Sequence, residues 1–118
     1  MIGGDYLKVS KELLKGSTVI LILSLLDKQP MYGYEMIKAI EDKSSGTFSF
    51  KEGTLYPILH SLEAKGMVES YWDSTASRKR KYYRITPSGQ AHAREKKTEW
   101  TVFKEAVDRV LGEALLWT

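Results

Sequence analysis

The clearest chemical signal in the sequence is a run of basic side chains in its second half. Five basic residues and no acidic one occupy positions 78 to 84: Arg78, Lys79, Arg80, Lys81 and Arg84. Without these five, the 18 basic residues of the chain fall to 13, against 15 acidic ones. The net charge of +3 is therefore concentrated in one place. A basic patch on an otherwise slightly acidic chain is typical of a protein that binds a polyanion.

The other reactive residue types form no catalytic or metal-binding pattern. The chain has no cysteine, which excludes disulfides, thiolate metal sites and cysteine nucleophiles. Its two histidines and scattered acids match no catalytic motif, and the sequence contains no glycine-rich phosphate loop. We therefore expect a protein that is not an enzyme and that needs no metal or cofactor.

Length and composition predict a single soluble domain. The 118 residues are 42% hydrophobic and 28% charged, which is enough for one buried core. The longest apolar run, from Val19 to Leu26, is interrupted by Ser24 and is much shorter than the roughly 20 residues that span a bilayer. The first residues lack the basic segment and apolar stretch of a signal peptide. These features together predict a cytoplasmic protein.

Apolar residues recur at helical spacing in four stretches. They predict helices at about residues 8–26, 33–43, 52–65 and from 87 toward the C-terminus. Gly16 and Ser17 lower the helix propensity of the first stretch and mark either a bend or a start. Before the last stretch, Thr86 and Pro87 have the residue types of an N-cap and a first helical position.

Residues that favour β-structure dominate three further stretches. They predict strands at 47–50, 67–73 and 81–85. Small polar residues at 74–77 separate the last two strands, so we expect a β-hairpin with Trp72 packed in it. The basic run begins at the tip of this hairpin and continues along its second strand.

This order of elements is that of a winged helix-turn-helix, a mainly α-helical (α+β) fold with a β-hairpin wing. In that architecture the third helix enters the major groove of DNA and the wing lies against the phosphate backbone or the minor groove. We expect residues 1–86 to form the DNA-binding domain, with its N-terminal helix at 8–26. Residues 87–118 are expected to form a dimerisation helix.

The candidate DNA contacts come from the third helix and the wing. The first turns of that helix supply side chains for base edges and phosphates, namely Lys51, Thr54, Tyr56 and His60. The wing supplies four consecutive cations that would bind phosphates and release counterions, namely Arg78, Lys79, Arg80 and Lys81.

The last helix predicts a partner. Its first half is almost wholly polar, whereas its second half carries apolar residues that include Phe103, Val107, Val110, Leu111 and Ala114. An apolar face at the end of a small chain needs a cover, and a second copy of the chain is the most natural one. We therefore expect a homodimer that is joined through this helix.

Four motifs stand out along the chain. They are Tyr-Gly-Tyr-Glu at 32–35, Gly-Thr-Leu-Tyr-Pro at 53–57, Leu-Glu-Ala-Lys-Gly at 62–66 and Arg-Lys-Tyr-Tyr-Arg-Ile-Thr at 80–86. Together they resemble the PadR family of bacterial transcriptional regulators. The resemblance covers about Lys15 to Gly89, and the second and fourth motifs at this separation make it specific.

The resemblance implies a homodimeric repressor of an inverted-repeat operator, which a small aromatic ligand often relieves. By the same match, the DNA contacts fall on Tyr34, Lys51, Thr54, Tyr56 and the wing. The single long C-terminal helix is similar to that of the small subfamily, whose members dimerise through it. The expected partners are therefore double-stranded DNA with a pseudo-palindromic operator and a small aromatic effector.

The resemblance also points to a ligand site. Some members of that subfamily hold a flat ligand between paired tryptophans of the two C-terminal helices, and Trp100 stands at the corresponding place, eleven residues after Gly89. With Leu13 and Val19 of the first helix, it would line a pore at the dimer centre. Indole faces stack well on aromatic ligands. The alternative is that Trp100 belongs to the interface core.

Structural alternatives accompany the other candidates. Edge strands also carry basic residues as protection against pairing, although four in succession exceed that need. Tyr32, Tyr34 and Tyr56 would alternatively cover the junction of the second and third helices, and His60 would alternatively be a partly buried surface histidine. A different function also fits the pattern: a winged-helix protein-interaction module whose wing docks on an acidic protein.

Overall fold

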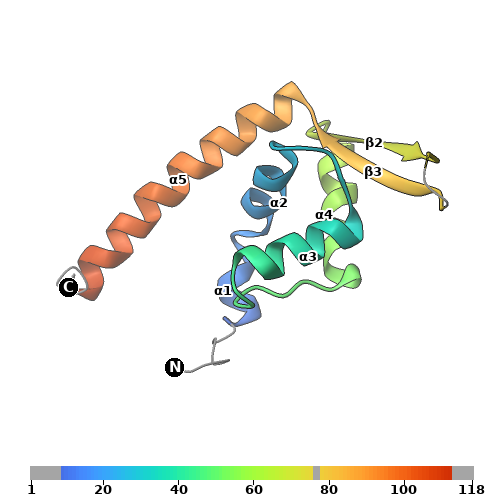
Figure 1. Ribbon diagram of the computed structural model, residues 1–118. Helices are drawn as coiled ribbons and strands as arrows, with labels where there is room; N and C mark the ends of the chain where they lie inside the picture. The colour runs from blue at the N-terminus through green and yellow to red at the C-terminus, as the bar shows by residue number, and fades with distance from the viewer. Residues whose placement is uncertain (1–8, 76–77, 113–118) are drawn as a thin grey trace.

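The computed structural model describes residues 9–75 and 78–112 of the chain (Figure 1). The elements follow in the order α1 (Lys11–Lys15), α2 (Thr18–Leu26), β1 (Met31–Tyr32), α3 (Gly33–Lys43), α4 (Glu52–Ala64), β2 (Val68–Asp73), β3 (Arg80–Ile85) and α5 (Pro87–Leu111). The predicted fold class, mainly α-helical with a β-hairpin wing, is confirmed. Among the helices of the described residues, none is long and apolar enough to cross a membrane.

The first predicted helix is divided into two. The hydroxyl of Ser10 caps α1 by accepting a hydrogen bond from the Leu13 N–H at 3.3 Å. Gly16 ends α1 after five residues, and α2 begins after Ser17. The single helix expected at 8–26 is therefore wrong, whereas the alternative that Gly16 and Ser17 mark a helix start is confirmed, because their low helix propensity ends one helix and starts another.

The strand predicted at 47–50 is also wrong. This segment pairs with no strand and is held by Phe50, which is buried, and by the Phe48 N–H, which donates to Ser44 Oγ at 2.9 Å. The third strand is instead the two-residue β1, which pairs with β3. The alternation of aromatic and polar residues indicates a segment with one buried side, which need not be a strand. One edge of β3 pairs with β2 and the other with β1, so no edge of β3 remains for residues 47–50.

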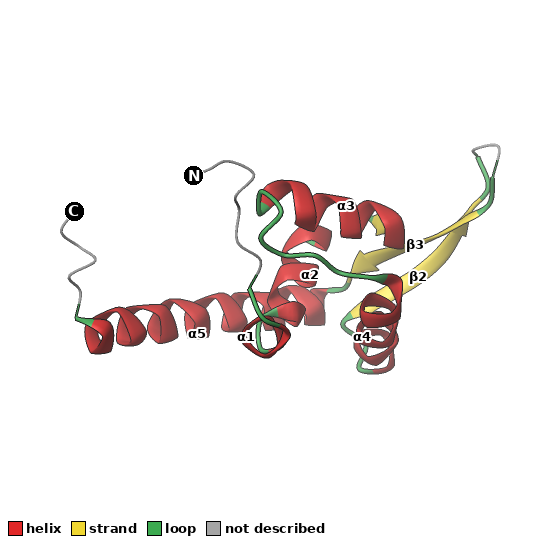
Figure 2. Ribbon diagram, turned by 90° about the horizontal axis from the view of Figure 1, so that it is seen from below, coloured by secondary structure: helices red, strands yellow, loops and turns green. Residues whose placement is uncertain are grey.

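The sheet is antiparallel, with β3 between β1 and β2. In the hairpin, Ser70 pairs with Tyr83 and Trp72 pairs with Lys81. The base of the hairpin packs on α2, α3 and α4, where the fully buried side chains are Ile22, Leu23, Met36, Leu55, Leu59, Val68 and Tyr83. The hairpin extends from this body on one side, and α5 extends on the other (Figure 2).

Helix α5 has the N-terminus that the sequence predicts. The Thr86 hydroxyl accepts a hydrogen bond from the Gly89 N–H at 3.0 Å, and Pro87 occupies the first turn. The helix packs on α2, and Ala93 in its first half is buried. The described part of the helix ends at Gly112, whose φ of 96° is the left-handed conformation that glycine adopts readily. Ala114, a predicted dimerisation residue, lies outside the described residues.

The junction between β3 and α5 leaves no room for a side chain at Gly89. A Cβ atom there would overlap the main-chain carbonyl of Met67 and lie 2.8 Å from Cγ1 of Ile85. We expect Gly89→Ala to lower the free energy of unfolding by about 1–3 kcal/mol, since overpacking a tight contact costs that much. Urea-induced unfolding followed by circular dichroism measures the change.

Gly16→Ala is the matched control, because a Cβ at Gly16 would meet no atom within 4 Å and its φ of −75° suits alanine. This variant should be as stable as the wild type or more stable by up to about 1 kcal/mol. Equal unfolding midpoints for all three proteins would contradict the close contact at Gly89.

Candidate nucleic-acid interface

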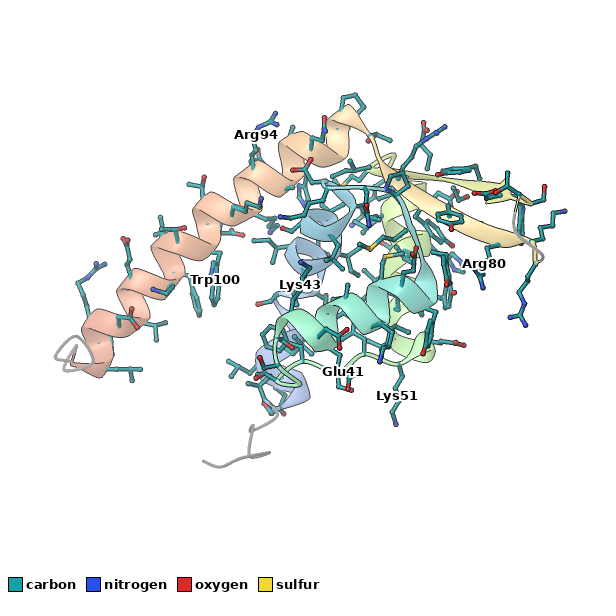
Figure 3. The ribbon with its side chains drawn as sticks, in the orientation of Figure 1. Glu41, Lys43, Lys51, Arg80, Arg94 and Trp100 are labelled. Atoms are coloured by element: carbon teal, nitrogen blue, oxygen red, sulfur yellow. The ribbon has the colours of Figure 1, made fainter. Side chains whose placement is uncertain are left out.

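The first turn of α4 projects from the body of the protein. Leu55, Leu59 and Leu62 bury one side of this helix, whereas residues 51–54 are all exposed. Lys51 is the N-cap residue, and its side chain points away from the core (Figure 3). The free N–H groups of a helix N-terminus favour an anion, and Lys51 adds a positive charge beside them. The predicted residues Lys51 and Thr54 thus lie together on an accessible surface.

Gly53 leaves open space in this turn. A Cβ atom at Gly53 would meet no atom within 4 Å, so packing does not require glycine there. Glycine within a helix costs roughly 0.5–1 kcal/mol relative to alanine. Without a side chain at Gly53, an external molecule can approach the backbone of the first turn of α4 closely.

Tyr56 has a different environment from Lys51 and Thr54. It is half-buried, and its phenol ring lies against Gly33, where even a Cβ atom would overlap it. Its ring centroid is 6.3 Å from that of His60, which is exposed one turn later. The ring of Tyr56 therefore joins α3 to α4, as in the packing alternative for this residue, while part of the side chain remains accessible.

Two tyrosines at the start of α3 differ in their surroundings. Tyr34 is 57% exposed on the first turn. Tyr32 is half-buried and is the N-cap residue, and its N–H donates to Glu35 Oε1 at 3.1 Å. Tyr34 is therefore accessible on the first turn of α3, whereas Tyr32 belongs to the sheet.

The four wing cations of the prediction differ in their surroundings. Arg78 and Lys79 are exposed, whereas Arg80 and Lys81 are half-buried. Three of them lie over aromatic rings: Lys79 over Trp72 (5.3 Å from its Nζ to the ring centroid), Arg80 over Tyr32 (4.6 Å from its Cζ) and Lys81 over Tyr83 (5.7 Å from its Nζ). Such contacts hold cations in place without neutralising them.

The fifth basic residue of the run is neutralised. Arg84 Nε donates to Glu69 Oε1 at 2.9 Å, and the guanidinium also lies 4.7 Å from the ring centroid of Tyr71. In the part of the chain that the structure describes, this is the one ion pair formed by the basic run. The charge available to an external anion therefore comes from residues 78–81.

Trp72 is a surface residue that sequence reasoning placed incorrectly. It was expected to pack within the hairpin, but its side chain is 59% exposed. The reason is that Trp72 and Lys81 form a cross-strand pair beyond the point where Tyr83 and Ser70 meet the core. Two residue pairs further along a protruding hairpin, a side chain on the same face no longer reaches the core.

The wing is fixed to α4 at its base. Ser70 Oγ donates to Glu63 Oε2 at 2.6 Å, and Tyr83 is buried between the sheet and the helices. Burial raises the pKa of the Tyr83 phenol, and the charge of Glu63 raises it further, so the phenol stays neutral. These contacts set the angle between the two surfaces that carry the candidate residues.

A separate groove of about 680 Å³ lies between α5 and the α1–α2 region. Its lining includes Leu13, Trp100, Phe103 and Val107, and the rings of Trp100 and Phe103 are 5.8 Å apart. Figure 3 shows Trp100 on the side of α5 that faces the body. Val19 does not line this groove, because its half-buried side chain packs against the core instead.

Charges at the rim of the groove are paired with one another. Lys96 Nζ lies 2.9 Å from Glu99 Oε1, and Lys104 Nζ lies 3.7 Å from Asp108 Oδ2. Most of the remaining lining is apolar, and Leu13 and Phe103 are 68% and 55% exposed. An exposed apolar surface of this kind fits another apolar surface or a flat aromatic molecule.

Comparisons with known proteins agree on one family. The sequence model of the transcriptional regulator PadR-like family matches residues 22–95. An uncharacterised protein of Lysinibacillus sphaericus is 38% identical over 101 residues, which cover 85% of this chain and 93% of that protein.

Solved structures give the same result. A PadR family transcriptional regulator from Eggerthella lenta has a TM-score of 0.76 at 38% identity, over 86% of this chain and 87% of its own. A transcriptional regulator from Clostridium thermocellum has a TM-score of 0.78 at 35% identity, over 84% of this chain and 97% of its own.

Proposed function

The chain belongs to the PadR-like family of transcriptional regulators, and from this premise we propose that it binds double-stranded DNA as a homodimeric repressor. The family that the motifs resemble is confirmed, and so is the prediction that the chain is not an enzyme, since family members are transcriptional regulators. The observation that carries the proposal is the pairing of an exposed α4 N-terminus with a rigidly attached wing that holds unneutralised cations.

The two surfaces contribute different contacts. Thr54 and Lys51 on the first turn of α4 reach base edges and phosphates in the major groove, and the helix N-terminus favours a phosphate. The wing residues at 78–81 bind phosphates of the adjacent backbone. The exposed side chains of Tyr34 and His60 and the accessible part of half-buried Tyr56 complete the proposed contacts.

The apolar face of α5 is the proposed dimer interface. Several apolar side chains on the second half of α5 are exposed in the single chain, namely Phe103 (55%), Val107 (36%), Val110 (85%) and Leu111 (67%). A second copy packed on this face would cover them, together with Leu13. In this proposal residues 1–86 are the DNA-binding domain and residues 87–118, which include α5 and Ala114, are the dimerisation region.

Two-fold symmetry determines the kind of operator. A C2 dimer presents two α4 helices about 34 Å apart, which is one turn of B-DNA. The operator is accordingly an inverted repeat. In the same dimer the groove beside Trp100 and Leu13 becomes partly enclosed, and a small aromatic ligand bound there would relieve repression by changing the distance between the two α4 helices.

Separate roles for α4 and the wing can be tested with operator DNA selected from a random pool. Thr54→Ala should lower the ratio of operator to random-DNA affinity by roughly 5- to 100-fold, because a lost base contact costs about 1–3 kcal/mol. Lys79→Ala should weaken binding to both DNAs equally and reduce the salt slope by about 1. Gel-shift titrations at several salt concentrations measure both effects.

Equal losses on both DNAs for the two variants would refute this division of roles. If the random pool yields no enriched inverted repeat at all, DNA recognition itself is rejected. A protein-interaction module that docks on an acidic protein would then be the better interpretation of the wing.

The proposed interface predicts a monomeric variant. Phe103→Glu places a charge in the centre of the apolar face, so we expect the mass measured by light scattering to fall from two chains to one. Thr98→Glu is the control, because this exposed residue is not among those that line the groove. A wild-type protein that stays monomeric at all concentrations, or a dimeric Phe103→Glu variant, would contradict the interface.

The ligand site predicts quenching of Trp100 fluorescence. Anilinonaphthalene sulfonate, an anionic aromatic probe, should bind in the groove, and Trp100→Ala should weaken its binding about tenfold through the loss of aromatic contact. Trp72→Phe, a change in the wing, should leave the affinity unchanged. A titration in which Trp100→Ala binds the probe as tightly as the wild type would remove Trp100 from the site.

A further inference from the structure

The outer face of the sheet carries a row of three tyrosines, one from each strand. Tyr32 of β1, Tyr82 of β3 and Tyr71 of β2 are cross-strand neighbours. The Tyr32 and Tyr82 ring centroids are 5.4 Å apart in an edge-to-face arrangement, and those of Tyr82 and Tyr71 are 5.8 Å apart in a stacked one. These residues, the tyrosine row, form a continuous aromatic surface across the sheet.

An arginine of β3 lies at each end of the tyrosine row. The Arg80 Cζ lies 4.6 Å from the centroid of Tyr32, and the Arg84 Cζ lies 4.7 Å from that of Tyr71. Both arginines share a face with Tyr82 because side chains alternate along a strand. The two guanidinium groups therefore have matching aromatic contacts.

Their electrostatic surroundings differ. Arg84 is neutralised by Glu69 at 2.9 Å. Arg80 lies opposite Asp73 in the strand pairing, but the Asp73 carboxylate accepts hydrogen bonds from the Thr75 N–H (2.9 Å) and hydroxyl (2.7 Å). Across residues 9–75 and 78–112, no carboxylate forms an ion pair with Arg80. Arg80 is thus held by an aromatic ring while its charge remains available.

Tyr32 lies where the wing meets the helix-turn-helix body. Tyr32 is the N-cap residue of α3, so its ring connects the wing to the helix-turn-helix body. Arg80 is the first residue of β3 and pairs with Asp73 at the tip end of the two strands, and its guanidinium lies over the ring of Tyr32 (Figure 3). A guanidinium that is already positioned loses less side-chain entropy when it binds a phosphate than a mobile one does.

We propose that Tyr32 is a positioning residue, which holds the guanidinium of Arg80 in place to bind a phosphate of duplex DNA. Arg84, with the same kind of aromatic contact but a carboxylate partner, stabilises the sheet and contributes no phosphate contact. This inference rests on the DNA binding proposed above. It goes beyond that proposal because it assigns distinct roles to two arginines of one strand and a role to Tyr32.

Matched variants at the two ends of the tyrosine row test this inference. Affinity for the selected operator is measured between about 50 and 200 mM salt for the wild type, Tyr32→Leu, Tyr32→Phe and Tyr71→Leu. Tyr32→Leu should weaken binding about fivefold, since a mobile side chain must then be immobilised, and should reduce the salt slope by up to about 1. Tyr32→Phe, which keeps the ring, and Tyr71→Leu should bind as the wild type does.

A double-mutant cycle separates positioning from a general structural effect. In an Arg80→Ala background, Tyr32→Leu should cause no further loss of affinity, because the residue on which it acts is absent. An equal loss in both backgrounds would overturn the inference, and so would a loss for Tyr71→Leu as large as that for Tyr32→Leu.

Failure of the inference can be distinguished from failure of the proposed function. A wild-type protein that binds the operator while Tyr32→Leu binds equally well rejects only the role of Tyr32. A wild-type protein that binds no duplex rejects both. Urea unfolding of each variant shows whether a substitution has reduced stability. If Tyr32→Leu binds more weakly while Tyr32→Phe keeps the affinity of the wild type, the result supports the role of the aromatic ring.

Discussion

The arrangement of the wing depends on the position of β3 between two neighbouring strands. Because side chains alternate along a strand, one face of β3 places Tyr83 in the core while the other places Arg80, Tyr82 and Arg84 on the outer surface. A shift of one residue in the pairing would expose Tyr83 and bury charged groups. Burial of a single aromatic side chain thus determines where the cations of the wing lie.

A second junction connects this unit to α5. The Thr86 hydroxyl donates to the Gly66 carbonyl at 2.7 Å and accepts from the Gly89 N–H, while the Thr86 N–H donates to the Met67 carbonyl at 3.0 Å. One residue therefore joins the end of α4, the end of β3 and the start of α5. Any movement of α5 at the groove would act on α4 and the wing through this junction, and the proposed response to a ligand depends on that connection.

The cations of the wing show why a count of charges describes binding poorly. Arg84 is paired with Glu69, and Asp73 is engaged by Thr75, whose hydrogen bonds lower the pKa of that carboxyl. The remaining cations lie on aromatic rings or in solvent. Such a surface retains its charge for a polyanion and reduces the freedom of the side chains that carry it.

The sequence alone determined the helices at 33–43 and 52–65, the hairpin, the cap at Thr86 and the location of the basic run, because spacing, caps and turns depend on residues close together in the chain. Only the tertiary structure placed β1 beside β3, exposed Trp72 and brought Arg80 onto Tyr32. These features depend on contacts between residues far apart in the chain, and periodicity within one segment carries no information about its distant partners.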